Sequence, residues 1–259
     1  MVVMKTDEWL ERLLVSSDNT VLAHKEIICA PLIPFFKNVT AGEIQFELLR
    51  QGLFKPDEID IVKRFLTTSF WQTAEQEYNR LRKLWSGPDS AVILLPITQE
   101  GPQKNGVAYR KALVLFFSTQ IEEIEFKALL AHEYHHVCRL AYLQQSPDQI
   151  TLLDSLIIEG LAEYTVEQLY GEQYLSPWTK RYSKEEIDPI WKQYFVQNLR
   201  LNGVNNHRDY LYGNHKMPPW IGYCIGYRIV QSFAASQKDL ATYLSMPAHQ
   251  ILENSSFSI

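Results

Sequence analysis

Apolar residues recur at helical spacing through the first third of the chain, with polar residues between them. The segment 6–17 (TDEWLERLLVSS) opens with acidic residues in its first turn, which is typical of a capped helix start. The segment 41–52 ends at a glycine, and the segment 55–85 has a proline near its beginning. The sequence SGPDS at 86–90 then interrupts the periodicity. The pattern therefore predicts mostly helices over residues 5–85.

Two short apolar runs follow this helical region. They are AVILLPIT at 91–98 and KALVLFFS at 111–118, and each is typical of a buried strand. The loop between them contains two glycines and a proline, and its last part, 106–109, is a candidate for an edge strand. These runs predict one small sheet.

Helical periodicity returns after the strands. Two strong helices are predicted at 121–143 and 149–170. Further along, a long polar connection at 205–219 precedes an apolar helix at 220–235, which starts after two prolines. Together these elements predict an α+β fold that is mostly helical, with a small mixed sheet.

The length of 259 residues suffices for one large domain or two intimate subdomains. The interruption at 86–90 predicts a helical N-terminal region at 1–88 and a second domain at 89–259. Within the second domain, we expect the strands and the two strong helices at 89–170 and a helical subdomain at 171–259.

Composition excludes several classes of protein. Hydrophobic residues make up 46% and charged residues 21%, an ordinary globular balance, and the formal net charge of −5 offers no basic face for nucleic acid. Cys29, Cys138 and Cys224 are far apart and odd in number, which predicts no disulfide framework and suits a reducing compartment. The apolar runs are too short to span a bilayer, and the N-terminus lacks a signal-peptide pattern. We therefore expect a cytoplasmic protein without a membrane partner.

The stretch LLAHEYHHVC at 129–138 contains the metal-binding pattern HExxH. In a helix, residues four apart lie on nearly the same side, so His132 and His136 are able to point at one ion. Two imidazoles in this arrangement suit zinc. Glu133 then lies beside the ion, placed to take a proton from a metal-bound water. The spacing predicts a zinc site.

A helical wheel of this segment separates its three histidines. His132 and His136 flank the apolar stripe, whereas His135 projects from the opposite side and is expected to be solvated. Glu133 falls in the middle of the stripe, where burying an unpaired carboxylate is costly. The stripe consists of Phe126, Leu130, Val137, Leu140 and Ala141. A carboxylate in that place favours a catalytic role over a histidine-rich surface turn.

A third ligand has to come from elsewhere in the chain. Arg139 and Tyr142 stand where a metzincin would carry a glycine and a histidine, so that class is excluded. Glu159 and Glu163 lie four apart, at the edge of the apolar face of the next predicted helix. A turn at 144–149 would return this helix antiparallel and bring Glu159 toward the histidines. Glu163 is then a candidate to orient a ligand histidine, although the two glutamates also fit the reverse assignment.

An HExxH motif followed on a later helix by a glutamate and a second acid four residues on resembles the gluzincin signature. More narrowly, the segments HEYHHVCRL, IIEGLAEY and PPWIGYCIGYRIV resemble the YjaZ-like family of predicted zinc-dependent proteases. This resemblance implies a zincin-like core, a zinc ion and peptidase activity. The chain departs from the gluzincin pattern at Ile158, where an asparagine is usual, and at Glu163, where an aspartate is usual.

The resemblance also implies a tyrosine that stabilises the oxyanion, because aminopeptidase-type gluzincins carry one on a later helix. Tyr223 is the favoured candidate. Substrates of zincins lie extended along a sheet edge, and the segment 105–109 is the candidate strand here, with a plain hairpin connection as the alternative. The Gly-x-Met-Glu-Asn exopeptidase motif does not occur in the sequence. The alternatives to Tyr223 are Tyr227, Tyr210, Tyr212, His207 and His215.

These residues predict a zinc metallopeptidase with a peptide or protein substrate. His132, His136 and Glu159 are expected to bind zinc, with water at the fourth position. Glu133 is the expected general base. The main alternative is a catalytically inactive zinc protein of the same fold that binds a peptide or partner, but a binding site needs no base such as Glu133. A metal-free helical interaction protein is the remaining hypothesis.

Overall fold

The computed structural model describes residues 3–16, 21–36, 38–235 and 240–257. The chain divides into two compact units, Met1–Val137 and Cys138–Ile259, and each is described here by itself. This division falls elsewhere than the expected domain boundaries at 88/89 and 170/171, which stay predictions.

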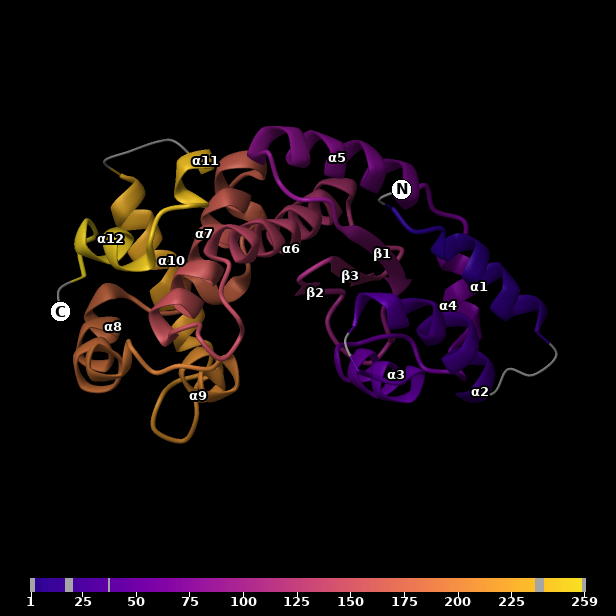
Figure 1. Ribbon diagram of the computed structural model, residues 1–259, viewed down its shortest axis with the longest axis horizontal. Coiled ribbons are helices and arrows are strands. Elements are labelled where there is room, and N and C mark those ends of the chain that lie inside the picture. The colour runs from indigo at the N-terminus through magenta and orange to yellow at the C-terminus, as the bar shows by residue number, and fades with distance from the viewer. Residues whose placement is uncertain (1–2, 17–20, 37, 236–239, 258–259) are drawn as a thin grey trace. The chain divides into compact units, whose positions relative to one another are not determined.

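The first unit begins with helices, as predicted for residues 5–85 (Figure 1). They are α1 (Thr6–Val15), α2 (Val21–His24), α3 (Ala41–Arg50), α4 (Ile59–Phe65) and α5 (Phe70–Trp85), with a π-turn at Lys25–Cys29 and a 3-10 turn at Ala30–Phe35. The helical segment predicted at 55–85 is in fact two helices. The hydroxyls of Thr67 and Thr68 donate to the carbonyls of Arg64 and Phe65, which competes with helical backbone bonding at the break.

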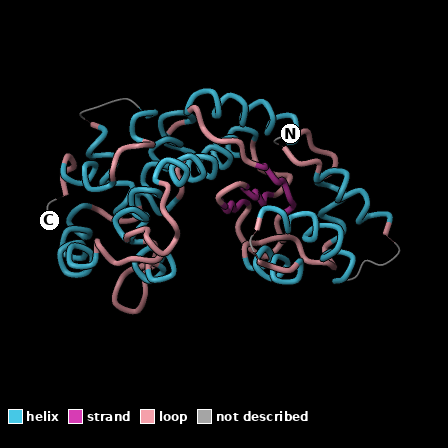
Figure 2. Tube along the Cα trace, viewed as in Figure 1, coloured by secondary structure: helices cyan, strands magenta, loops and turns pink. Residues whose placement is uncertain are grey.

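A three-stranded mixed sheet forms within the described part of the first unit. Its strands are β1 (Ala91–Pro96), β2 (Lys104–Tyr109) and β3 (Ala112–Phe117), in the order β1-β3-β2. β1 pairs with β3 in parallel, and β2 pairs with β3 antiparallel. Figure 2 shows these short strands in magenta. Every residue of β1 and β3 is buried, whereas β2 is half-buried along its whole length.

Phenylalanines join the sheet to its helices. The ring of Phe117 in β3 lies 4.8 Å from that of Phe65 in α4 and 4.9 Å from that of Phe70 in α5. It also lies 4.9 Å from the ring of Phe126, near the start of α6 (Glu123–Leu143). α6 therefore begins packed on the sheet, and it carries the HExxH motif.

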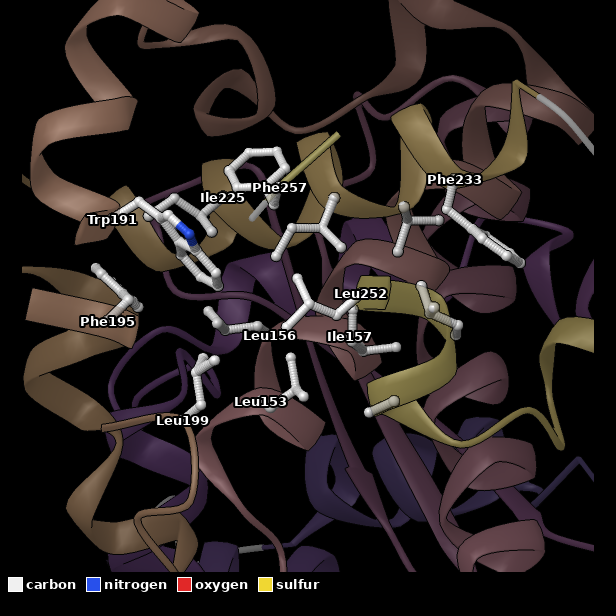
Figure 3. Packing of buried hydrophobic residues seen from close by; sticks show 14 of the residues in the cluster. Leu153, Leu156, Ile157, Trp191, Phe195, Leu199, Ile225, Phe233, Leu252 and Phe257 are labelled. Atoms are coloured by element: carbon white, nitrogen blue, oxygen red, sulfur yellow. The ribbon is translucent and has the colours of Figure 1, made fainter. Parts of the chain in front are cut away.

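The second unit is helical. It consists of the last turns of α6 together with α7 (Leu152–Tyr170), α8 (Lys184–Ile190), α9 (Arg208–Tyr212), α10 (Ile221–Ala234), α11 (Leu240–Tyr243) and α12 (Ala248–Glu253). α7 starts at a capping box in which the side chains of Thr151 and Asp154 bond each other's backbone N–H. Its core gathers Leu156 and Ile157 of α7, Ile225 of α10 and Leu252 of α12 (Figure 3).

Two glycines allow α7 and α10 to pack backbone to backbone. A Cβ at Gly160 would lie 2.1 Å from the carbonyl oxygen of Gly226, and a Cβ at Gly226 would lie 2.2 Å from that of Leu156. A side chain at either glycine would therefore force the helices apart.

The predicted class, a mostly helical α+β fold with a small mixed sheet and an HExxH helix, is confirmed. Among the described residues, no helix combines the length and the apolar character that crossing a membrane requires.

Candidate metal centre

Three groups that could hold a metal ion lie together on consecutive turns of α6. One ligand atom each from His132, Glu133 and His136 lie within 4.8 Å of one another. The two imidazole rings are 4.5 Å apart at an interplanar angle of 86°. His132 is half-buried, and Glu133 and His136 are 6% and 8% exposed. Two imidazoles at this spacing suit zinc, and a carboxylate beside them suits a base acting on a zinc-bound water, so the residues present fit a zinc ion.

Glu133 lies directly against strand β2. A Cβ built on Gly106 would fall 2.4 Å from Cγ of Glu133 and 2.6 Å from both Cδ and Oε1. The carboxylate therefore occupies the space that any side chain at this position would need. The apolar pattern of the sequence does not single out Gly106, although a glycine inside a strand is a known signal that another group approaches the backbone closely.

The backbone next to Glu133 faces the unpaired edge of the sheet. The Ser118 N–H donates to the Gln103 carbonyl at 2.9 Å, and the pairing register alternates from there. Lys104, Gly106 and Ala108 consequently turn their N–H and C=O groups away from β3. In the described part of the chain no strand pairs with that edge.

Tyr109, the last residue of β2, carries a buried hydroxyl group. The Tyr109 hydroxyl has no hydrogen-bond partner among the described residues. Burial, and then the negative charges of Glu47 and Glu133, raise the pKa of Tyr109 to about 12. This phenol therefore keeps its proton at neutral pH.

The expectation that His135 is solvated is wrong. The side chain is 1% exposed, and its ring stands edge-on to Trp85 of α5 at 5.5 Å. Trp85 also stacks on Tyr134, whose hydroxyl donates to the Pro88 carbonyl at 2.9 Å. α5 thus covers the side of α6 that the wheel assigned to solvent.

Glu159 and Glu163 lie one turn apart on α7, in the second unit. Glu159 is half-buried. Glu163 is 1% exposed and accepts hydrogen bonds from both the backbone N–H and the hydroxyl of Ser176. Glu163 therefore anchors a loop to α7, which favours Glu159 as the ligand and leaves that assignment a prediction.

Two of the candidates for oxyanion stabilisation are buried and bonded elsewhere. Both ring nitrogens of His207 are engaged at 2.8 Å, one with the Ser155 hydroxyl and one with the Leu201 carbonyl. Tyr227 is fully buried and its hydroxyl accepts from Gln231. Burial, followed by the charge of Glu167, raises the pKa of Tyr227. Neither group faces solvent, where a substrate would arrive.

The structure brings Tyr223 and Tyr212 together. Their hydroxyl oxygens are 3.0 Å apart, and Tyr223 is 8% exposed whereas Tyr212 is 45% exposed. The sequence placed Tyr210 and Tyr212 in a loop, which is wrong, because both belong to α9. Tyr210 packs its ring on Phe195, and His215 is exposed after α9.

The sequence of this chain is similar to those of known proteins. Residues 70–253 match the model of the family described as "Predicted Zn-dependent protease (DUF2268)". The chain is 30% identical to the uncharacterized protein YjaZ of Bacillus subtilis (strain 168), over 98% of this chain and 99% of that one. It is also 30% identical to the uncharacterized protein YjfC of the same organism, over 41% of this chain and 38% of that one. No solved structure matches the chain.

Proposed function

We propose that this chain, which belongs to the family of predicted Zn-dependent proteases (DUF2268), is a zinc peptidase of gluzincin type. One observation carries the proposal. His132, Glu133 and His136 present their ligand atoms within 4.8 Å of one another, beside an open sheet edge. A structural zinc site needs neither a glutamate next to its histidines nor a free strand.

The metal ligands in this proposal are His132, His136 and Glu159. Glu159 is preferred to Glu163 because both carboxylate oxygens of Glu163 accept hydrogen bonds from Ser176. A bound zinc ion supplies Lewis-acid chemistry, lowering the pKa of water and polarising a carbonyl.

Glu133 is the general base. Its carboxylate takes a proton from the attacking water and later delivers it to the leaving amine. Gly106 leaves the space in which this carboxylate lies, and that fixed position is what proton transfer requires. Tyr223 donates a hydrogen bond to the developing oxyanion. In the structure its hydroxyl donates to the Tyr212 hydroxyl at 3.0 Å, so in this proposal the Tyr223 proton turns to the oxyanion and the Tyr212 hydroxyl becomes the donor to Tyr223.

The substrate is a peptide or a protein that lies extended along β2. The outward backbone groups of Lys104, Gly106 and Ala108 are the pairing partners for such a strand. A cytoplasmic location, expected from the cysteine usage, is part of the same proposal.

The test is the Glu133→Gln variant, which keeps the shape of the side chain and removes its basicity. We expect zinc content equal to that of the original chain and a loss of peptide cleavage of at least ~100-fold. A variant that keeps both zinc and full activity would overturn the mechanism. Peptide binding without cleavage by the zinc-loaded original chain would favour the inactive binding protein instead.

Elemental analysis of protein purified without added metal tests the ligands separately. The double variant His132→Ala/His136→Ala should lose zinc that the original chain carries. Equal zinc in both proteins would reject the ligand assignment. Absence of zinc from the original chain would favour a metal-free interaction protein.

A further inference from the structure

We propose that Trp178, Trp220 and Tyr212 form a subsite that binds an aromatic side chain of the peptide substrate. We name these three residues the aromatic platform. The inference rests on the proposed function, in which Tyr223 donates to the oxyanion, and it adds a substrate class to that function.

The rings of the platform touch one another. Trp178 and Trp220 stack at 4.4 Å with an interplanar angle of 9°, and Tyr212 stands edge-on to Trp220 at 5.0 Å. Tyr223 contacts all three, at 5.6, 5.3 and 5.3 Å from Trp178, Trp220 and Tyr212. The four rings thus form one continuous aromatic surface.

Part of this surface is exposed to solvent, and the surface includes the proposed oxyanion donor. Tyr212 is 45% exposed, both tryptophans are half-buried and Tyr223 is 8% exposed. The hydroxyls of Tyr212 and Tyr223 are 3.0 Å apart. A side chain lying on the platform is therefore within one residue's reach of the group that Tyr223 would contact.

The backbone of Trp220 is held in a strained conformation. Its φ of 65° and ψ of 18° lie in the left-handed region, which bulky residues rarely adopt and which glycine or asparagine would occupy more easily. Strain of this kind persists where the surroundings fix it, and it gathers at binding sites. The strained backbone at Trp220 therefore supports a binding role for its indole ring.

Contacts on both sides fix the platform in place. The Trp220 N–H donates to the Tyr212 carbonyl at 2.9 Å. A Cβ at Gly222 would lie 2.5 Å from the Tyr210 carbonyl oxygen, so this glycine lets α9 approach α10. Glu163 holds Ser176, which precedes the 3-10 turn Pro177–Lys180 that carries Trp178. A preorganised platform of this kind binds without first paying the cost of ordering its side chains.

The chemistry of the platform favours an aromatic occupant. Flat rings pair with aromatic side chains in offset or edge-to-face geometry. They also attract cations, but Arg181 and Lys216, which lie near the two tryptophans in the sequence, disfavour a further positive charge. The geometry and the charges together select phenylalanine, tyrosine or tryptophan over lysine or arginine.

The experiment uses the zinc-loaded full chain and peptides that differ at one residue, phenylalanine, alanine or lysine, moved across both sides of the cleaved bond. At one position we expect kcat/KM for phenylalanine to exceed that for alanine by ~10-fold or more. The variants Trp220→Leu and Trp178→Leu should reduce this phenylalanine-to-alanine ratio ~10-fold, and Trp220→Phe should restore part of it. Phe46→Leu removes an exposed aromatic ring of α3 and is the matched control.

Equal cleavage of all peptides, or a ratio that neither leucine variant changes, would overturn the subsite while leaving the peptidase standing. A preference for lysine would overturn the aromatic assignment. Binding is measured independently by tryptophan fluorescence of Glu133→Gln with the same peptides. Preferential binding of the phenylalanine peptide, without cleavage by the original chain, would reject the peptidase and keep the subsite.

Discussion

At the scale of single residues, the position of Glu133, the proposed general base, depends on its neighbour Gly106. Glu133 is 6% exposed, and the missing side chain of Gly106 is what makes its position available. Burying a carboxylate costs folding free energy unless its surroundings compensate the charge. The glycine at position 106 of β2 is therefore part of what positions the proposed base on α6.

Replacing Gly106 with alanine should displace the Glu133 carboxylate. The added Cβ would lie 2.4 Å from Cγ of Glu133, so one of the two has to move. We expect peptidase activity to fall ~10- to 100-fold, because small misplacements of catalytic groups are costly. Zinc content should stay the same, as should activity in the control Gly42→Ala, where the nearest atom is 3.9 Å away. Unchanged activity would show that Glu133 tolerates the displacement.

We expect His24 to make the stability of the first unit depend on pH. The side chain is fully buried, its Nε2 contacts the Phe54 carbonyl at 3.1 Å and its Nδ1 contacts the Gln45 amide at 2.9 Å. Burial lowers its pKa from 6.5 to about 4. The unfolded chain then binds the proton more readily than the folded chain, so stability present above pH 6.5 is lost as the pH falls toward 4.

The loss should amount to about 3 kcal/mol of unfolding free energy across that window. Urea unfolding at pH 7 and pH 4.5 measures it. His24→Gln should be less stable at pH 7 but less sensitive to pH, whereas the exposed His249→Gln should keep the original pH dependence. Identical pH slopes in all three proteins would remove His24 as the cause.

At the scale of elements, the sequence predicted what local patterns determine. The strands at 91–98 and 111–118 appear as β1 and β3, and the helix at 149–170 appears as α7. Their apolar runs and the capping residue Thr151 are local signals. The break between α4 and α5 was missed because two threonines that bond backward look ordinary in a helical pattern.

The errors at the candidate site have a different origin. His135 was assigned to solvent because a helical wheel shows one helix's own apolar stripe and not what covers its other side, here Trp85 of α5. The stripe itself is buried up to Val137, whereas Leu140 is half-buried and Ala141 is exposed. The pairing of Tyr212 with Tyr223 joins elements separated by a glycine and two prolines, and no periodicity encodes it.

The contact between α7 and α10 should be intolerant of side chains. Gly226→Ala would place a Cβ 2.2 Å from the Leu156 carbonyl oxygen, and a backbone atom cannot move aside as a flexible side chain can. We expect a loss of about 2–3 kcal/mol in unfolding free energy, typical of overpacking. Urea unfolding measures it, with Gly42→Ala as the neutral control. If Gly226→Ala kept the unfolding free energy of the original chain, the close backbone contact between α7 and α10 would be contradicted.

At the scale of the whole molecule, zinc binding should be linked to folding. An ion that binds only the folded chain stabilises it in proportion to the logarithm of its concentration over Kd. In the proposed function, zinc should therefore stabilise the folded chain.

We expect zinc to raise the melting temperature and a chelator to lower it. Glu159→Ala should weaken zinc binding by at least ~10-fold and shrink that shift. Glu163→Gln should instead lower stability with or without zinc, because it weakens the anchor on Ser176. If Glu159→Ala kept the full zinc shift and Glu163→Gln lost it, the assignment of the two glutamates would be reversed.

The glycine contact between α7 and α10 has one more consequence. Glu159 is adjacent to Gly160, and Tyr223 lies three residues before Gly226, so both groups are carried at the tightest point of the helix pair. Backbones in direct contact leave little freedom to slide or rotate past one another. The distance between the backbone positions of the proposed ligand Glu159 and the proposed oxyanion donor Tyr223 is therefore fixed by this contact. Thermal motion of the surrounding loops should leave that distance unchanged.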